Sequence, residues 1–184
     1  MNLEFFNIIE KEQEYKKYLM FHIEHVEEAY HRLIEPLLGK YDKAVDDAVL
    51  LCGQYIPLHD LSKLSKYEFD DYRQFYYPTD EEKKFQDKNE KKADAIKKAW
   101  EHHYQNNPHH PLYWVKDGIK QDMPLNFIFE MFCDWSSVGQ WFGTSTITWY
   151  DTSAVDEKAA FSDNTREQVE KWFDIIFRVP GIKF

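Results

Sequence analysis

Apolar residues recur at steps of three and four along most of the chain, which is the pattern of amphipathic helices. The first such stretch runs from about Glu12 to Leu38, and Gly39 fits the residue that follows a helix end. A second stretch opens at Asp42, a residue type that caps helix N-termini well. Its apolar stripe consists of Val45, Ala48, Val49 and Cys52.

Short polar motifs mark where the later helices begin and end. Ser65–Glu68 has the form of a capping box, and Pro78 would end the helix that this box opens. Residues 79–92 are mostly charged and polar, as expected of an exposed linker or a fraying helix start. Residues 143–163 show no helical period and are expected to be irregular. Two further helices are expected at about 93–105 and about 124–142. A second capping box at Thr165–Gln168 would open a last helix at about 165–178.

The composition agrees with a helical, globular fold. Only 6 Gly and 7 Pro occur among 184 residues, which leaves little material for turns. A chain of this length can bury a substantial core as one domain. We therefore expect an all-α bundle of about six helices that forms a single domain over residues 1–184, with no sheet of more than two short strands.

The net charge and the lengths of the apolar runs limit which binding partners and which cellular compartment are expected. The formal net charge of −10 argues against binding to a nucleic-acid duplex, which normally requires a basic face. No apolar run approaches the roughly 20 residues of a membrane span, and the N-terminus lacks the basic segment of a signal peptide. Cys52 and Cys133 lie in apolar stretches, as is typical of a reduced, cytoplasmic protein.

The histidines gather in a few short motifs. Five of the eight belong to the pairs His59-Asp60, His102-His103 and His109-His110, and the other three lie on the first helix. Imidazole and carboxylate groups together suit zinc, iron, manganese and nickel. A metal site whose ligands come from several helices is common in helical bundles. The pattern therefore predicts a site for a divalent metal ion.

The first half of the chain offers three candidate positions for this site. His25 precedes Ala29 by four residues, which puts it on the apolar stripe of the first helix. His59 and Asp60 lie between apolar residues, and the two oxygens of the Asp60 carboxylate could bridge two ions. Lys63, three residues further on, could place its ammonium near an anionic ligand.

The second half adds further candidates. His103 lies on the inward stripe of its helix, and Pro108 fixes a turn that could bring His109 or His110 back beside it. Asp134 lies among large apolar residues on a helix. Because burial of an unpaired carboxylate is costly, we expect a cation beside Asp134.

The order of these motifs resembles that of the HD-domain superfamily of metal-dependent phosphohydrolases. Within that superfamily, a bacterial and phage family labelled only as a domain of unknown function is similar to the blocks HDLSKLSKYEFDDYRQFYYP, AWEHHYQNNPHHPLYW and MPLNFIFEMFCDW. The resemblance covers roughly residues 22–135. It implies an HD-type fold, with a metal-binding core at about 15–142 and a C-terminal helix at about 165–178.

The resemblance also implies a ligand set. The ligands of a mononuclear site would be His25, His59, Asp60 and Asp134. His103, with His109 or His110, would match the ligands that some members use for a second ion. The spacing between His103 and His109 is shorter than in those members, so the choice among the histidines at 102, 103, 109 and 110 stays open. The cofactor would be one or two divalent ions per chain, of Mn, Fe, Zn, Ni or Mg.

The implied activity is hydrolysis of a nucleotide or a related small phosphate ester. Asp60 and Lys63 would act in catalysis, and Lys63 with Arg73 would hold the phosphate. The histidine-rich second site leaves a di-iron oxygenase as an alternative. The many aromatic residues favour a second alternative function, that of a non-catalytic binding protein in which a metal ion is structural. The sequence does not indicate an oligomeric state.

Overall fold

The computed structural model describes residues 3–86 and 90–178, which divide into two compact units. Unit 1 consists of Met1–Phe21 and Asp60–Asn107, and unit 2 of His22–His59 and Pro108–Phe184, as far as these segments are described. Each unit has a hydrophobic core of its own. The chain passes from one unit to the other at three peptide bonds.

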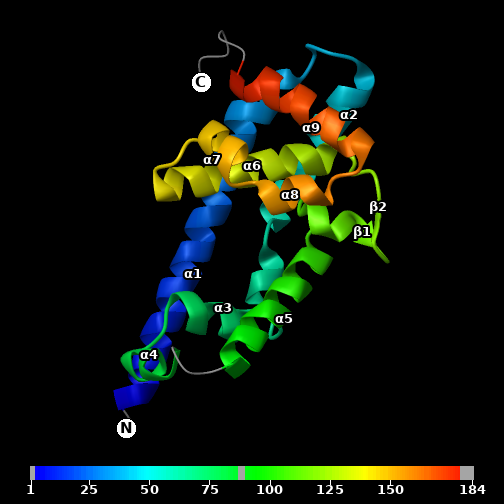
Figure 1. Ribbon diagram of the computed structural model, residues 1–184. Helices are drawn as coiled ribbons and strands as arrows, with labels where there is room; N and C mark the ends of the chain where they lie inside the picture. Colours follow the sequence, from blue (N-terminus) through cyan, green and yellow to red (C-terminus); the bar gives the residue numbers. More distant parts are fainter. Residues whose placement is uncertain (1–2, 87–89, 179–184) are drawn as a thin grey trace. The chain divides into compact units, whose positions relative to one another are not determined.

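Both units are built almost entirely from helices, so the expected all-α class is confirmed for the described residues (Figure 1). Unit 1 contains most of α1 (Leu3–Ala29), followed by α3 (Phe69–Tyr76), α4 (Asp80–Gln86) and α5 (Glu90–Asn106). Unit 2 contains the end of α1 and then α2 (Lys43–Tyr55), α6 (Leu125–Phe142), α7 (Thr146–Thr152), α8 (Val155–Ala160) and α9 (Asp163–Phe173). None of the described helices combines the length and the hydrophobicity that a bilayer crossing requires.

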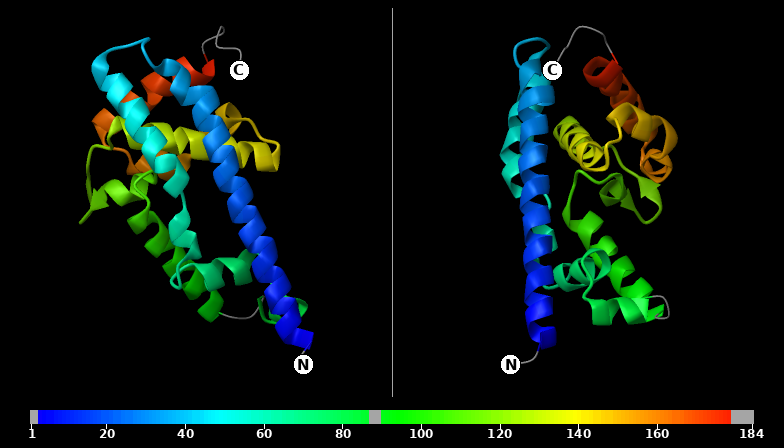
Figure 2. Two further views of the ribbon diagram at one scale, coloured as in Figure 1. Left: turned by 180° about the vertical axis from the view of Figure 1, so that it is seen from behind. Right: turned by 90° about the vertical axis from the view of Figure 1, so that its left-hand side faces the viewer.

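Helix α1 is drawn as one continuous element in both views of Figure 2. It continues into a π-helical turn at Tyr30–Ile34 and a 3-10 turn at Glu35–Leu37, so the expected end near Leu38 is confirmed. Gly39 follows with a φ of 68°, the left-handed conformation that favours glycine after a helix.

The strands among the described residues form one small hairpin, as expected from the prediction of no sheet with more than two short strands. β1 (Val115–Lys116) pairs antiparallel with β2 (Ile119–Lys120). Asp117 and Gly118 join them with φ angles of 51° and 75°. Two positive φ angles are what the tightest hairpin turns require.

Helix α2 begins and packs as its sequence predicts. The Asp42 carboxylate accepts a hydrogen bond from the backbone N–H of Val45 at 3.0 Å and caps the helix. The predicted stripe, which includes Val49 and Cys52, is buried, and α2 packs against α6. Cys52 and Cys133 are both buried, free thiols.

The expectation of an irregular stretch at 143–163 is wrong, because α7 and α8 lie there. These helices have seven and six residues, too few for a helical period to be visible in the sequence. Ser145 caps α7 by accepting from the Thr148 N–H at 3.1 Å. Ser162 caps α9 by accepting from the Thr165 N–H at 3.1 Å, so this helix starts about two residues earlier than expected.

The first predicted capping box is also misplaced. At Ser65–Glu68 the Glu68 carboxylate binds two histidines, whereas a capping box forms at Thr79–Glu82. There the Glu82 N–H donates to Thr79 Oγ1 at 3.2 Å, and the Thr79 N–H donates to Glu82 Oε2 at 2.8 Å. The box opens α4 inside the expected linker at 79–92, of which residues 87–89 lie outside the described residues.

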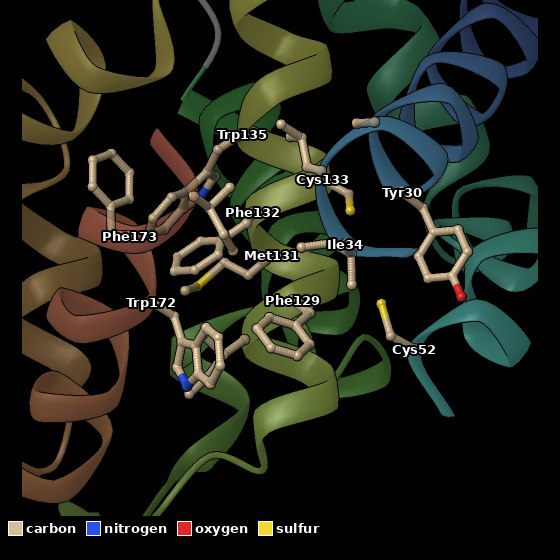
Figure 3. Close-up of a cluster of buried hydrophobic side chains, with 14 of the residues drawn as sticks. Tyr30, Ile34, Cys52, Phe129, Met131, Phe132, Cys133, Trp135, Trp172 and Phe173 are labelled. Atoms are coloured by element: carbon tan, nitrogen blue, oxygen red, sulfur yellow. The ribbon is translucent and has the colours of Figure 1, made fainter. Parts of the chain in front are cut away.

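The core of unit 2 surrounds α6, which packs against both α2 and α9. Figure 3 shows aromatic side chains of α6 facing those of α9. The Phe129 and Trp172 rings meet edge to face at 5.3 Å, and the Phe132 and Phe173 rings at 5.8 Å. Because this packing fixes α6, it also fixes the polar side chains that α6 carries.

The core of unit 1 is smaller and joins three helices. Tyr15 and Leu19 of α1 pack with Tyr72 of α3 and Ala99 of α5, and all four are at most 5% exposed. A core of this size depends on few contacts, so the polar groups beside it contribute visibly to the stability of the unit.

Close packing at the end of α6 yields a stability prediction. A Cβ added to Gly139 would lie 2.5 Å from the backbone oxygen of Thr144, which cannot move without displacing the loop before α7. The better helix propensity of alanine is worth about 1 kcal/mol, less than the cost of this contact. We expect Gly139→Ala to lower the free energy of unfolding by roughly 1–3 kcal/mol in urea denaturation.

The exposed neighbour Gln140 provides the matched control, since Gln140→Ala should change the free energy of unfolding by less than about 0.5 kcal/mol. A Gly139→Ala variant as stable as the wild type would contradict the close approach of the loop to α6.

Candidate metal centre

His59 is placed by the way α2 ends. Pro57 has no backbone N–H, and after Tyr55 the chain tightens into a 3-10 turn at Ile56–Leu58. The His59 N–H donates to the Ile56 carbonyl at 3.1 Å and ends this turn. The His59 side chain is buried, at 1% exposure.

Two helices of unit 2 bring polar side chains to His59. His22 of α1 lies with its Nε2 3.2 Å from His59 Nε2 and 3.3 Å from Asp134 Oδ1 of α6. His59 Nε2 is 3.7 Å from the same oxygen of Asp134. Ser137 hydrogen-bonds to His22 Nδ1 at 2.9 Å and so orients that ring. Two imidazole nitrogens and a carboxylate oxygen therefore converge.

One turn before Asp134, the Glu130 carboxylate holds two imidazoles. Its Oε1 lies 3.0 Å from His59 Nδ1 and 3.1 Å from His109 Nδ1. Burial raises the pKa of Glu130, but the hydrogen bonds with His109 and His59 outweigh burial and bring the pKa to about 2. An ionised carboxylate can only accept, so both Nδ1 atoms carry protons, and each neutral ring keeps its lone pair on Nε2.

His109 reaches this group from the loop before α6. The Trp114 indole N–H donates to the Pro108 carbonyl at 2.7 Å and closes the loop around His109. The His109 ring lies 4.3 Å from that of His59, with 33° between their planes, and is almost completely buried. The His110 ring, partly buried, lies 4.3 Å from His109.

The residues of this cluster fit a divalent metal ion. His59, His109 and Asp134 each offer one ligand atom, and these atoms lie within 4.8 Å of one another. Burial opposes ionisation of Asp134, but hydrogen bonds with His22 and His59 hold its pKa well below the usual value. Imidazole nitrogens with an ionised carboxylate are a donor set for zinc, iron, manganese or nickel. His22, beside His59 and Asp134, would be a fourth ligand.

Unit 1 contains a second polar cluster. It begins at Asp60, whose φ of 58° is left-handed, a conformation that aspartate tolerates. Lys63 Nζ donates to Asp60 Oδ2 at 2.5 Å, and His103 Nε2 lies 3.2 Å from Asp60 Oδ1. The fully buried Glu68 binds His103 Nδ1 at 2.9 Å and His102 Nδ1 at 2.6 Å.

The charges of the second cluster favour a protonated His103. Burial lowers the pKa of His103, but the charge of Asp60 and the hydrogen bonds to Asp60 and Glu68 raise it overall. Burial raises the pKa of Glu68, and the hydrogen bonds with His103 and His102 lower it by more. In unit 1, His103 therefore bridges two carboxylates as a hydrogen-bond donor.

The structure places the sequence-predicted residues in different surroundings. His59, His109 and Asp134 form one group in unit 2, whereas Asp60, Lys63 and His103 lie together in unit 1. The expected combination of His59 with Asp60, and a second ion bridged by Asp60, remain predictions. His25 is only partly buried and is not a member of the unit 2 group.

Three polar residues of these clusters were missed in the sequence. His22, Glu68 and Glu130 are each at most 5% exposed and each bind a histidine or a carboxylate. Glu130 had a usable signal, because it precedes Asp134 by four residues and therefore shares its helix face.

Arg73 is bound within unit 1, and its expected role in holding phosphate remains a prediction. It is 3% exposed, and its two terminal nitrogens contact the Glu82 oxygens at 2.6 and 2.8 Å. This bidentate pair adds to the capping box of α4, so the guanidinium has a structural partner.

A family model matches residues 11–175, which is most of the chain. The chain belongs to DUF5662, a family of unknown function. No curated protein and no solved structure gave a significant match. Membership of DUF5662 agrees with the resemblance to a domain of unknown function, whereas the HD-type assignment of this DUF5662 chain remains a prediction.

The metal cluster gives a direct test of which histidine on α1 is a ligand. We expect His22→Ala to raise the dissociation constant for a divalent ion at least roughly 10-fold, since it removes a ligand. His25→Ala, three residues away, is the matched control and should bind as the wild type does. Calorimetric titration with Mn²⁺ or Zn²⁺ measures both, and circular dichroism checks folding. Loss of binding in His25→Ala alone would favour the ligand expected from the sequence.

The Arg73–Glu82 pair predicts a stability effect that depends on pH. Burial raises the pKa of Glu82, but the hydrogen bonds from Arg73 and Thr79 lower it below the ordinary value. Its stabilisation is therefore present above the unfolded pKa of about 4.3 and is lost as the pH falls through the lower folded pKa. At neutral pH, Glu82→Gln should cost roughly 2–4 kcal/mol, because Arg73 stays buried without its counter-ion.

The adjacent Glu81 is the control for this prediction. It pairs with Lys84 on the surface, so Glu81→Gln should cost less than about 0.5 kcal/mol. Urea denaturation at pH 7 and at pH 3 distinguishes the two variants, and equal losses at pH 7 would contradict the buried pair.

Proposed function

We propose that this DUF5662 protein is a metal-dependent hydrolase of a small phosphate ester, such as a nucleotide. The proposal is carried by the group of His59, His109 and Asp134, whose ligand atoms lie within 4.8 Å of one another. With His22 as a fourth ligand, an ion that takes six ligands, such as Mn²⁺ or Fe²⁺, would still keep positions for water and substrate. The resemblance to HD-domain phosphohydrolases supports a phosphate ester as the substrate.

A divalent ion bound by this group would supply Lewis-acid chemistry, because it polarises a phosphoryl oxygen and acidifies water. The chain itself prepares the ligands. Glu130 holds the Nδ1 atoms of His59 and His109, so that their Nε2 lone pairs are available for a cation. Asp134 is ionised at neutral pH and adds the negative charge that favours a cation over a proton.

Of the two basic residues expected to hold phosphate, we assign the role to Lys63. Its ammonium donates to Asp60 Oδ2 at 2.5 Å, and an ammonium can donate to more than one acceptor. The guanidinium of Arg73 is bound by Glu82 and is buried, so we do not assign it to the substrate.

Phosphate release by metal-stripped and reloaded protein tests the proposed function. We expect chelator-treated protein to be inactive and Mn²⁺, Fe²⁺ or Zn²⁺ to restore hydrolysis of a chromogenic phosphomonoester or a nucleoside monophosphate. His59→Ala should lose at least roughly 100-fold of the activity while remaining helical. Glu130→Gln, which weakens the acceptor of both Nδ1 protons, should lower metal affinity roughly 10- to 100-fold.

The exposed Glu167 of α9 is the control for Glu130, and Glu167→Gln should leave metal affinity unchanged. Metal-loaded protein that hydrolyses no ester in a broad screen would reject the proposal. Bound iron with consumption of O₂ would instead support the di-iron oxygenase.

A further inference from the structure

Unit 2 contains an open groove that the proposed function does not use. Its volume of about 600 Å³ lies in the range of small-molecule sites. Its residues come from the end of α1 and the turn after it, from the second half of α6, from α7 and the loop before it, and from the turn after α9. Figure 1 shows α7 beside the end of α6, and the two helices pack against each other. None of the proposed metal ligands lines the groove.

Two π-helical turns contribute side chains to this groove. Arg32 and Leu33 belong to the turn at Tyr30–Ile34, and Phe177 belongs to the turn at Asp174–Arg178. Turns of this kind are rare in proteins and occur frequently at functional sites. Both of the π-helical turns in the described part of the chain line the same groove, which favours a binding site over an incidental hollow of the surface.

The groove also presents one charge of each sign. Glu28 precedes Arg32 by four residues, the spacing at which such residues commonly pair on an α-helix. The π-helical turn begins between them and changes this register. Arg32 Nη2 donates instead to Ser136 Oγ of α6 at 3.1 Å, and Ser136 is 5% exposed. Among the described residues, neither Glu28 nor Arg32 forms an ion pair, and both side chains are exposed.

These charges select the kind of ligand. An anion bound at Arg32 would lie near the Glu28 carboxylate, and a cation bound at Glu28 would lie near the Arg32 guanidinium. Either ligand would meet repulsion from a like charge, whereas a ligand with both charges complements the groove. The planar guanidinium matches the geometry of a carboxylate, which it can bind through two N–H groups.

The rest of the groove favours an apolar group on the same ligand. Leu33, Ile147 and Phe177 line it from three different elements. Apolar surface of a ligand that is removed from water against these side chains contributes favourably to binding. A small molecule with a carboxylate, an ammonium and an apolar substituent is an α-amino acid.

We propose that this groove binds a free α-amino acid with an apolar side chain. Arg32 binds its carboxylate, Glu28 binds its ammonium, and Leu33, Ile147 and Phe177 contact its side chain. Ser136 is a positioning residue, because it holds the guanidinium at the wall of the groove. The site is separate from the metal centre, so the inference does not rest on the proposed function.

Ligand analogues test the proposal on the unmodified chain. Leucine, methionine and phenylalanine are titrated by calorimetry into full-length protein treated with chelator, so the state of the metal centre does not affect the result. We expect at least one of them to bind. Its amide, which lacks the carboxylate, and its N-acetyl derivative, which lacks the ammonium, should each bind at least roughly 10-fold more weakly.

Variants of the chain locate the site. Arg32→Gln and Glu28→Gln should each raise the dissociation constant of the amino acid at least roughly 10-fold, since each removes one charged partner. Glu27→Gln and Lys40→Gln are the matched controls, because both residues are exposed and lie outside the groove. These two variants should bind as the wild type does, and circular dichroism checks that all four are folded.

Three results would overturn the proposal. The first is a wild type that binds none of the three amino acids at concentrations up to about 10 mM. The second is an amide and an N-acetyl derivative that bind as well as the amino acid, which would show that the two charges are not recognised. The third is binding that Arg32→Gln and Glu28→Gln leave unchanged, which would place the amino acid elsewhere on the protein.

Discussion

A buried carboxylate that binds the Nδ1 atoms of two histidines is the interaction on which the polar interior of each unit depends. In unit 2, Glu130 holds His59 and His109, and in unit 1, Glu68 holds His103 together with its neighbour on α5. A histidine ring alone can turn and can carry its proton on either nitrogen. The bound carboxylate removes both freedoms, because it accepts only from Nδ1 and holds the ring in one plane. The other nitrogen of each ring then has a fixed direction and, in the neutral form, a fixed lone pair.

The same interaction leads to different chemistry in the two units because the second nitrogen meets different partners. His103 faces a second carboxylate, Asp60, so two acceptors stabilise its charged form. His59 faces the imidazole of His22 as well as Asp134. The two Nε2 atoms, 3.2 Å apart, are joined by a proton if His22 carries it on Nε2, or would be joined by a cation if both rings carry their protons on Nδ1. Glu130 and Asp134 lie one turn apart on α6 and both are ionised, so the local charge favours a cation.

The sequence predicts long helices, and it predicts buried ligand residues that follow the period of such a helix. It does not predict short helices, or which residues distant in the chain contact one another. α2 and α6 have enough turns to show a stripe, and the seven-residue α7 does not. On α1 the buried stripe passes through Leu19, His22 and Val26, and spacing from Ala29 alone had favoured His25. The spacing of Glu130 from Asp134 indicates a shared helix face, but it does not reveal the two histidines that Glu130 binds, which lie far away in the sequence.

The carboxylate of Glu82 has a consequence for the dynamics of unit 1. It accepts from Arg73 of α3 and from the backbone of Thr79 at the start of α4. A helix of seven residues is marginal by itself in water, and α4 would be expected to fray. Unwinding α4 would, however, remove the counter-ion of the buried Arg73 guanidinium on α3. The two helices therefore share one free energy of opening. Their amide protons should then exchange with solvent as a single cooperative group, and α4 should be protected to the same degree as α3.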